Sequence, residues 1–422
     1  MTSRLRSIVG GSAGNLVEWY DWYVYSAFTL YFAPVIFPKA SPTAQLLNAA
    51  AVFAVGFLMR PIGAWAMGIY SDRHGRKAGL TLSVTLMCAG SFLIALTPTY
   101  AAVGWGAPAL LVLARMMQGL SVGGEYGASA TYLSEMAHRD RRGFWASFQY
   151  VTLIGGQLVA LGMLIALQGL LDERALDAWG WRVPFAVGGL LAILVFRIRR
   201  GLIETESFRN AAADGTPRSS GAALFRDHPR AAWTVMALTA GGTLAFYAYT
   251  TYMQKFLVNT SGFDRMTASR VMTIALAFYA AFQPVMGALS DRVGRKPLMV
   301  GFGVAGLTTT VPLFVALERV RSPWVALALI MAALAILSAY TAISGLVKAE
   351  MFPAHIRTLG VALPYAIANT IFGGSAEYLA LWLKGIGHER WFYWYVTATI
   401  ALSLVAYVRM RDTARHSRIV ED

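Results

Sequence analysis

Apolar runs of about 20 residues recur from one end of this sequence to the other. Each run is long enough to cross the ~30 Å hydrocarbon core of a bilayer as a helix, which satisfies its own backbone hydrogen bonds. The composition agrees, with 57% hydrophobic and 14% charged residues, against roughly 45–50% apolar residues in soluble domains. The sequence therefore predicts an all-α membrane protein.

These runs predict twelve transmembrane helices, with boundaries good to a few residues. The expected helices are residues 8–37, 46–70, 78–98, 106–133, 144–170, 183–200, 231–257, 267–289, 297–317, 323–348, 359–385 and 391–409. The longest polar break contains ETESFRNAAADGTPRSSG and lies near the middle of the chain. We therefore expect an N-terminal six-helix half at 1–200, a cytoplasmic linker at 201–229, and a C-terminal half with a short cytoplasmic tail at 230–422.

Lys and Arg are concentrated at the termini and in the loops after even-numbered helices. The positive-inside rule then predicts a multi-pass protein with both termini in the cytoplasm. The net charge of +14 is spread over short loops, which favours contact with anionic lipid headgroups over nucleic acid binding. The single cysteine and the lack of a phosphate-binding loop argue against metal clusters and ATP hydrolysis. We expect no cofactor, no metal and no enzymatic activity.

Two sequence signals occur once in each half of the chain. GIYSDRHGRK from Gly68 returns as GALSDRVGRK from Gly287, and Glu135 with Arg142 returns as Glu350 with Arg357. The offset is nearly the same for both signals. Such duplication is typical of transporters built from two repeated halves, with the substrate bound between them.

The repeated loops have a mechanical interpretation. Their glycines permit a sharp turn, and their acids can meet helix termini and arginines. Such loops would act as latches that hold one conformation, although simple cytoplasmic anchoring is an alternative. The predicted latch residues are Gly68, Asp72, Arg73, Gly75, Arg76, Glu135, Arg142, Asp291, Arg292, Gly294, Arg295, Glu350 and Arg357.

The doubled GxxSDRxGRK loop resembles the signature of the major facilitator superfamily. Further stretches resemble its metabolite:proton symporter branch: EWYDWYVYS, GFLMRPIG, QGLSVGGEYGASATYLSE, SFQYVTLIGGQ, TTYMQKFLVNTSG, KAEMFPAHIRTLG and FGGSAEYLAL. The likeness runs nearly end to end and is greatest to bacterial α-ketoglutarate permeases. It implies a bacterial inner-membrane symporter of a small dicarboxylate and protons, and we expect it to function as a monomer. The sequence departs from this likeness at Tyr20 and Trp22, where two phenylalanines are expected.

Ionisable side chains inside the bilayer cost at least ~2.5–3.5 kcal/mol each, so they are expected to face a partner or a wet cavity. Glu18 and Asp21 lie along one stripe of the first helix, and Arg60 lies near the middle of the second. On the fourth helix, spacing places Arg115 and Gln118 on one face together with Tyr126. Glu125 falls on another face, among glycines that indicate close helix contact.

We expect the arginines to bind substrate carboxylates, although a structural ion pair is an alternative. Asp21 is the favoured proton carrier and is predicted to pair directly with Arg115, at positions that resemble the acid and arginine pair of sugar:proton symporters. Glu18 is the second candidate, unless it only holds a neighbouring helix. Lys255 is either a site residue or an interfacial lysine. The other predicted substrate contacts are Tyr25, Gln118, Tyr126, Gln157, Tyr249, Tyr252, Tyr365 and Asn369.

Competing functions remain on the sequence alone. A carrier of citrate, shikimate, betaine or proline is the nearest alternative. A drug:proton antiporter shares the expected fold, but central arginines do not suit cationic, greasy substrates. A non-transporting membrane sensor would require an added signalling domain. The central arginines therefore favour a small organic anion as the cargo.

Overall fold

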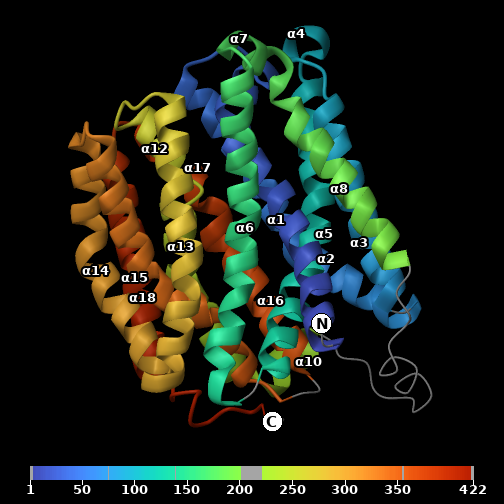
Figure 1. Cartoon of the computed structure of the whole chain (residues 1–422), viewed down its shortest axis with the longest axis vertical. Helices are drawn as coiled ribbons and strands as arrows, with labels where there is room; N and C mark the ends of the chain where they lie inside the picture. Colours follow the sequence, from blue (N-terminus) through green and yellow to red (C-terminus); the bar gives the residue numbers. More distant parts are fainter. Residues whose placement is uncertain (1–2, 75, 138, 201–220, 354–355, 420–422) are drawn as a thin grey trace.

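The computed structural model describes residues 3–74, 76–137, 139–200, 221–353 and 356–419. In some stretches of the helices only the backbone is described. Long helices run side by side along the longest axis of the molecule (Figure 1). The start of the first helix and the end of the last one lie at the same end of this bundle, and the short helices α4 and α7 lie at the opposite end.

The helices follow the apolar runs of the sequence closely. The long ones are α1 (Ser3–Ile36), α2 (Pro42–His74), α3 (Arg76–Leu96), α5 (Gly106–Met136), α6 (Arg142–Leu170), α8 (Arg182–Arg200), α11 (Pro229–Tyr249), α13 (Arg265–Val293), α14 (Arg295–Arg319), α15 (Pro323–Glu350) and α18 (Glu389–Arg409). The shorter ones are α4 (Tyr100–Val103), η1 (Arg139–Arg141), α7 (Glu173–Ala175), η2 (Leu176–Gly180), α10 (Gly221–Asp227), α12 (Met253–Asn259), α16 (Arg357–Ala368), η4 (Asn369–Gly373) and α17 (Gly374–Gly385).

Within the described residues, eight helices are long and apolar enough to cross a membrane, and the bent pair around Trp181 makes a ninth. The three remaining predicted spans are α1, α3 and α5. The first and last of these carry intramembrane charges, Glu18 and Asp21 on α1 and Arg115 and Glu125 on α5, which lower their mean hydropathy. These two helices supply much of the polar core described below.

Two spans are interrupted within the bundle. Between α11 and α12 the chain turns at Thr250, and the carbonyl of Thr251 accepts a hydrogen bond from the Ser26 hydroxyl at 3.4 Å. Between α16 and α17 lies η4, a π-helical turn that begins at Asn369. Interrupted helices and π-turns free backbone groups and re-aim side chains, so they are common at binding sites.

Glycines allow the helices to cross closely. On α5, Gly119 lies against the carbonyl of Gly56 and Gly123 against the carbonyl of Arg60 on α2. Gly127, one turn further, lies against Ala362 of α16 in the second half of the chain. The predicted close contact at this row of small residues is confirmed, and it fixes the backbone of Arg60 against α5.

The largest contact between the first and second halves of the chain is made by α6 with α13, which lie next to each other in Figure 1. At one end of this contact Gly143 and Gly287 face each other, and a Cβ on either one would collide with the backbone of the other. The two helices can pack so closely only because both positions lack a side chain.

Large apolar side chains also cover the outside of the bundle. Many leucines, valines and tryptophans are exposed, among them Trp65, Trp105, Trp324 and Trp391, each more than half accessible. In water a surface this apolar would be an association or aggregation site. Facing lipid, it is the expected exterior of a membrane protein.

We expect Gly287→Leu to destabilise the protein by about 1–3 kcal/mol, because the new side chain would overpack the crossing with Gly143. The measurement is the thermal unfolding of the purified protein in detergent. Gly301→Leu is the matched control, since no atom lies within 4 Å of a Cβ built at Gly301. Equal melting temperatures for both variants would contradict the close crossing.

Candidate functional site

Two arginines from different helices lie over the same indole ring in the middle of the first half. The guanidinium carbon of Arg60 is 4.0 Å and that of Arg115 3.9 Å from the centroid of Trp22. Arg60 also lies over Phe57 at 4.3 Å, and Arg115 over Tyr25 at 4.6 Å. Cation–π attraction of this kind partly replaces the hydration that each guanidinium loses.

Burial leaves these arginines short of hydrogen-bond partners. Arg60 is 3% and Arg115 0% exposed. In both side chains Nε and Nη2 are buried and have no hydrogen-bond acceptor in the described structure. Unmet donors on a buried charge are costly, and the planar guanidinium suits a carboxylate. The unpaired donors of the two arginines can therefore bind an anion.

A glutamine links Arg115 to the acid of the first helix. Gln118 Oε1 accepts from Arg115 Nη1 at 2.8 Å, and Gln118 Nε2 donates to Asp21 Oδ2 at 2.5 Å. The same amide also donates to Ser91 at 3.3 Å. The predicted direct pair of Asp21 with Arg115 is therefore wrong for this conformation, because Gln118 stands between them.

The other polar residues of the first helix are also buried. Glu18 is 5% exposed and lies one turn before Asp21. Asn15, one turn earlier, donates to Thr152 on α6 at 2.9 Å and accepts from the indole of Trp19. Along α1, the polar side chains therefore face α6 at Asn15 and face α5 and α3 at Asp21.

The second half contributes a wall of tyrosines and an amide. Tyr247 packs edge-on against Phe57, with ring centroids 5.1 Å apart. The side chain of Asn369, in the π-turn η4, is fully buried, and neither its oxygen nor its nitrogen has a hydrogen-bond partner in the described structure. The neighbouring Thr370 donates to the carbonyl of Phe57 and so joins the two halves at 2.7 Å.

Two predicted tyrosines meet across the halves. Tyr126 of α5 and Tyr365 of α16 stack with centroids 3.7 Å apart and planes 10° from parallel. The buried ammonium of Lys348 lies 4.3 Å above the ring of Tyr365. Lys348 was not among the predicted site residues, although a lysine inside an apolar helix was a signal for it.

A buried ion pair lies where α12 faces α1 and α17. Lys255 is fully buried, with Nζ 2.9 Å from Glu377 Oε1 and 2.9 Å from the hydroxyl of Ser26. Its interpretation as an interfacial lysine is therefore wrong. Gln157 lies nearby, lining a small cavity with Tyr23.

Two of the three remaining predicted tyrosines lie away from the arginines. Tyr249 hydrogen-bonds Thr310 on α14 at 2.7 Å, and Tyr252 donates to Glu389 of α18 at 3.3 Å. Both therefore pack inside the second half rather than near the arginines. Tyr25 does lie under Arg115, and its hydroxyl donates to the carbonyl of Ala49.

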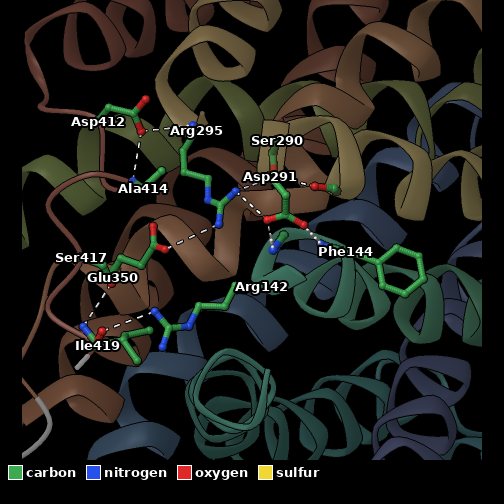
Figure 2. A network of polar contacts seen from close by, with 12 residues as sticks. Arg142, Phe144, Ser290, Asp291, Arg295, Glu350, Asp412, Ala414, Ser417 and Ile419 are labelled. Atoms are coloured by element: carbon green, nitrogen blue, oxygen red, sulfur yellow. Dashed lines mark hydrogen bonds and ion pairs between the residues drawn. The ribbon is translucent and has the colours of Figure 1, made fainter. Parts of the chain in front are cut away.

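A second polar network joins the halves at the end of the bundle where the described chain begins and ends (Figure 2). The carboxylate of Asp291 accepts from the backbone amides of Gly143 at 2.7 Å and Phe144 at 2.9 Å, at the start of α6. An acid at a helix N-terminus meets unpaired amides and the positive end of the dipole. Asp291 thus caps a helix of the other half.

Arg295, which also belongs to the second half, pairs with the capping carboxylate of Asp291. Its Nη1 lies 2.8 Å from Asp291 Oδ1, and its Nη2 lies 3.9 Å from Glu350 Oε1. Gly294 makes the turn between α13 and α14 with a φ of 97°, as expected for a glycine in a sharp turn. Arg292 is exposed.

The chain after α18 crosses the same face. Arg142 of the first half donates to the carbonyl of Ile419 at 3.4 Å, and Arg357 donates to the carbonyl of Arg418 at 3.0 Å. Figure 2 shows Arg142, Glu350 and Arg295 gathered beside this segment. The other predicted latch side chains lie outside the described residues: Gly68, Asp72, Arg73, Gly75, Arg76 and Glu135.

Comparison with known proteins shows which family the sequence matches. Residues 8–209 match the family described as Sugar (and other) transporter, and residues 256–421 match the Major Facilitator Superfamily. The chain is 52% identical to the alpha-ketoglutarate permease of Escherichia coli K12 over 99% of this chain and 96% of that protein. It is 34% identical to a citrate-proton symporter of Klebsiella pneumoniae, over 88% of this chain and 84% of that protein.

Solved structures show the same fold at low sequence identity. The proton:xylose symporter XylE, bound to 6-bromo-6-deoxy-D-glucose, superposes with a TM-score of 0.78 at 18% identity, over 98% of this chain and 97% of that one. A partially occluded inward-open form of XylE from E. coli gives a TM-score of 0.74 at 19% identity, over 96% and 97% of the two chains. The predicted twelve-helix fold is confirmed, and this chain belongs to the major facilitator superfamily of membrane transporters.

Proposed function

We propose that this transporter takes up a small dicarboxylate such as α-ketoglutarate together with protons, by alternating access. The observation that carries the proposal is the pair of buried guanidiniums over Trp22, each with two unpaired N–H directions. A carboxylate that leaves water needs a cation and paired donors, and Arg60 and Arg115 offer both. The 52% identity to an alpha-ketoglutarate permease supports the same cargo.

Proton coupling is proposed to act through Gln118. While Asp21 is ionised, its carboxylate holds the Gln118 amide, and that amide holds Arg115. A proton on Asp21 weakens this charge-assisted bond, which frees the amide to turn and releases Arg115 Nη1 for the substrate. Proton and anion would then enter together.

Alternating access needs contacts that close each end of the bundle in turn. Asp291 at the start of α6 and the Tyr126–Tyr365 stack join the halves at one end. At the other end Arg265 of α13 meets Asp177 of η2 at 3.1 Å. We propose that the first set is the cytoplasmic latch.

The membrane arrangement follows from the same proposal. Both termini would be cytoplasmic, in a bacterial-type inner membrane, with halves 1–200 and 230–422 rocking about the site and 201–229 linking them. We also propose that the protein functions as a monomer.

A carrier of citrate, or of proline and betaine, is the second candidate. A citrate-proton symporter and a proline/betaine transporter are 34% and 30% identical to this chain. Citrate has further carboxylates to satisfy, whereas betaine and proline carry one carboxylate and a cation. Two guanidiniums at one indole favour an anionic cargo over a zwitterion.

We expect Arg60→Ala and Arg115→Ala each to raise the KM for α-ketoglutarate uptake by about tenfold or more, because the buried carboxylate loses its cation and paired donors. Lysine at either position should rescue only in part. Arg270→Ala, at an exposed arginine on α13, is the control for loss of charge. The proposal is lost if Arg60→Ala keeps wild-type affinity for every organic acid tested.

Asp21→Asn should exchange labelled dicarboxylate across proteoliposomes but fail to concentrate it under an imposed pH gradient. The asparagine mimics the protonated acid, so binding persists while coupling is lost. The same two assays on Glu18→Gln decide between the carboxylates. Accumulation by Asp21→Asn against its gradient would move the coupling role away from Asp21.

Asp291→Asn should slow turnover and change substrate affinity less than about twofold, because its carboxylate caps α6 rather than contacting the two arginines. Uptake rates and equilibrium binding are measured side by side. Asp264→Asn is a matched control, since Asp264 caps its own helix α13 at the opposite end. A fall in affinity as steep as the fall in turnover would argue against a latch.

A further inference from the structure

The proposed site so far draws its cations from the first half only. The second half holds a buried cation of its own, Lys348 on α15. Its side chain is fully buried although it lies two residues before the end of the helix. Burial of an ammonium group is costly unless an anion or several acceptors replace its water.

The neighbours of Lys348 are polar but uncharged. Its Nζ donates to the hydroxyl of Ser344 at 2.9 Å and to that of Tyr126 at 3.3 Å. The rings of Tyr365 and Tyr126 lie 4.3 and 5.4 Å away. No carboxylate lies within 4.0 Å of this ammonium among the side chains that the structure describes. Lys255, the other buried lysine of the second half, does have one, Glu377.

The position of Lys348 connects it to the arginine site. Tyr126 lies on α5, the helix of Arg115, and stacks on Tyr365. The backbone of Arg60 meets α5 at Gly123, about one helical turn from Tyr126. Lys348 therefore contacts the tyrosine stack from the second half, and Tyr126 connects that stack to the helix that carries Arg115.

We propose that Lys348 binds the second carboxylate of the substrate and so selects dicarboxylates over monocarboxylates. One carboxylate then lies on the arginines of the first half and the other on the lysine of the second, so that only a dianion joins the halves. This inference rests on the proposed dicarboxylate function and adds the residue that binds the distal carboxylate. The hydroxyls of Ser344 and Tyr126 hold the ammonium while no substrate is bound.

The test compares two acids of equal length, α-ketoglutarate and 2-oxopentanoate, which differ in the distal carboxylate. Binding of each to the purified full-length protein is measured for the wild type and for Lys348→Met, which replaces a buried charge by an apolar side chain of similar length. We expect the wild type to prefer the dicarboxylate by about tenfold or more, and Lys348→Met to lose most of that preference. Thermal unfolding confirms that the variant is folded.

Two controls separate charge from packing. Lys348→Arg keeps a cation and should retain part of the preference, and Lys39→Met removes an exposed lysine outside the proposed site and should retain all of it. The inference is overturned if Lys348→Met keeps the full preference, or if it weakens both acids equally. If the wild type binds neither acid, the proposed function itself has failed, and this outcome is distinct from the other two.

Discussion

Two buried guanidinium groups share one indole ring, and the polar core of this transporter is arranged around that contact. Arg60 and Arg115 repel each other in a medium of low dielectric, and the electron-rich face of Trp22 offsets part of the repulsion. The helices must hold them there by close packing, for which Gly123 lets α5 approach the backbone of Arg60. Two positive charges buried in this way are stabilised by a nearby negative charge, and a substrate carboxylate can supply one.

The same constraint suits the position of Asp21, the proposed proton carrier. A carboxylate in direct contact with Arg115 would neutralise it and compete with any anionic cargo. In the proposed mechanism Gln118 transmits the protonation state of Asp21, and it leaves the Nε and Nη2 directions of the arginine unoccupied. Asp291 joins the halves in a different way, by accepting hydrogen bonds from backbone amides at the N-terminus of α6. The proposed cap at Asp291 and the proposed anion site on the arginines are thus built from different residues.

The sequence predicted the helices well, because each span is a long apolar run with charged ends. It also predicted the burial of Arg60 and Asp21, since an ionisable side chain inside a bilayer is stable only beside a partner or a wet cavity. It did not predict the Gln118 link or the role of Trp22, because helical spacing gives the face of a side chain and not its rotamer. For the same reason Tyr249 was expected at the site, whereas it packs against α14.

The central claim is that two buried guanidiniums make this protein a proton-coupled carrier of a dicarboxylate. Uptake of radiolabelled α-ketoglutarate into proteoliposomes that contain only the purified protein tests it most directly. With the outside made acidic, labelled acid should accumulate above its external concentration, and a protonophore should abolish the accumulation. Uptake that ignores the pH gradient, or a preference for betaine or proline over every dicarboxylate, would contradict the account.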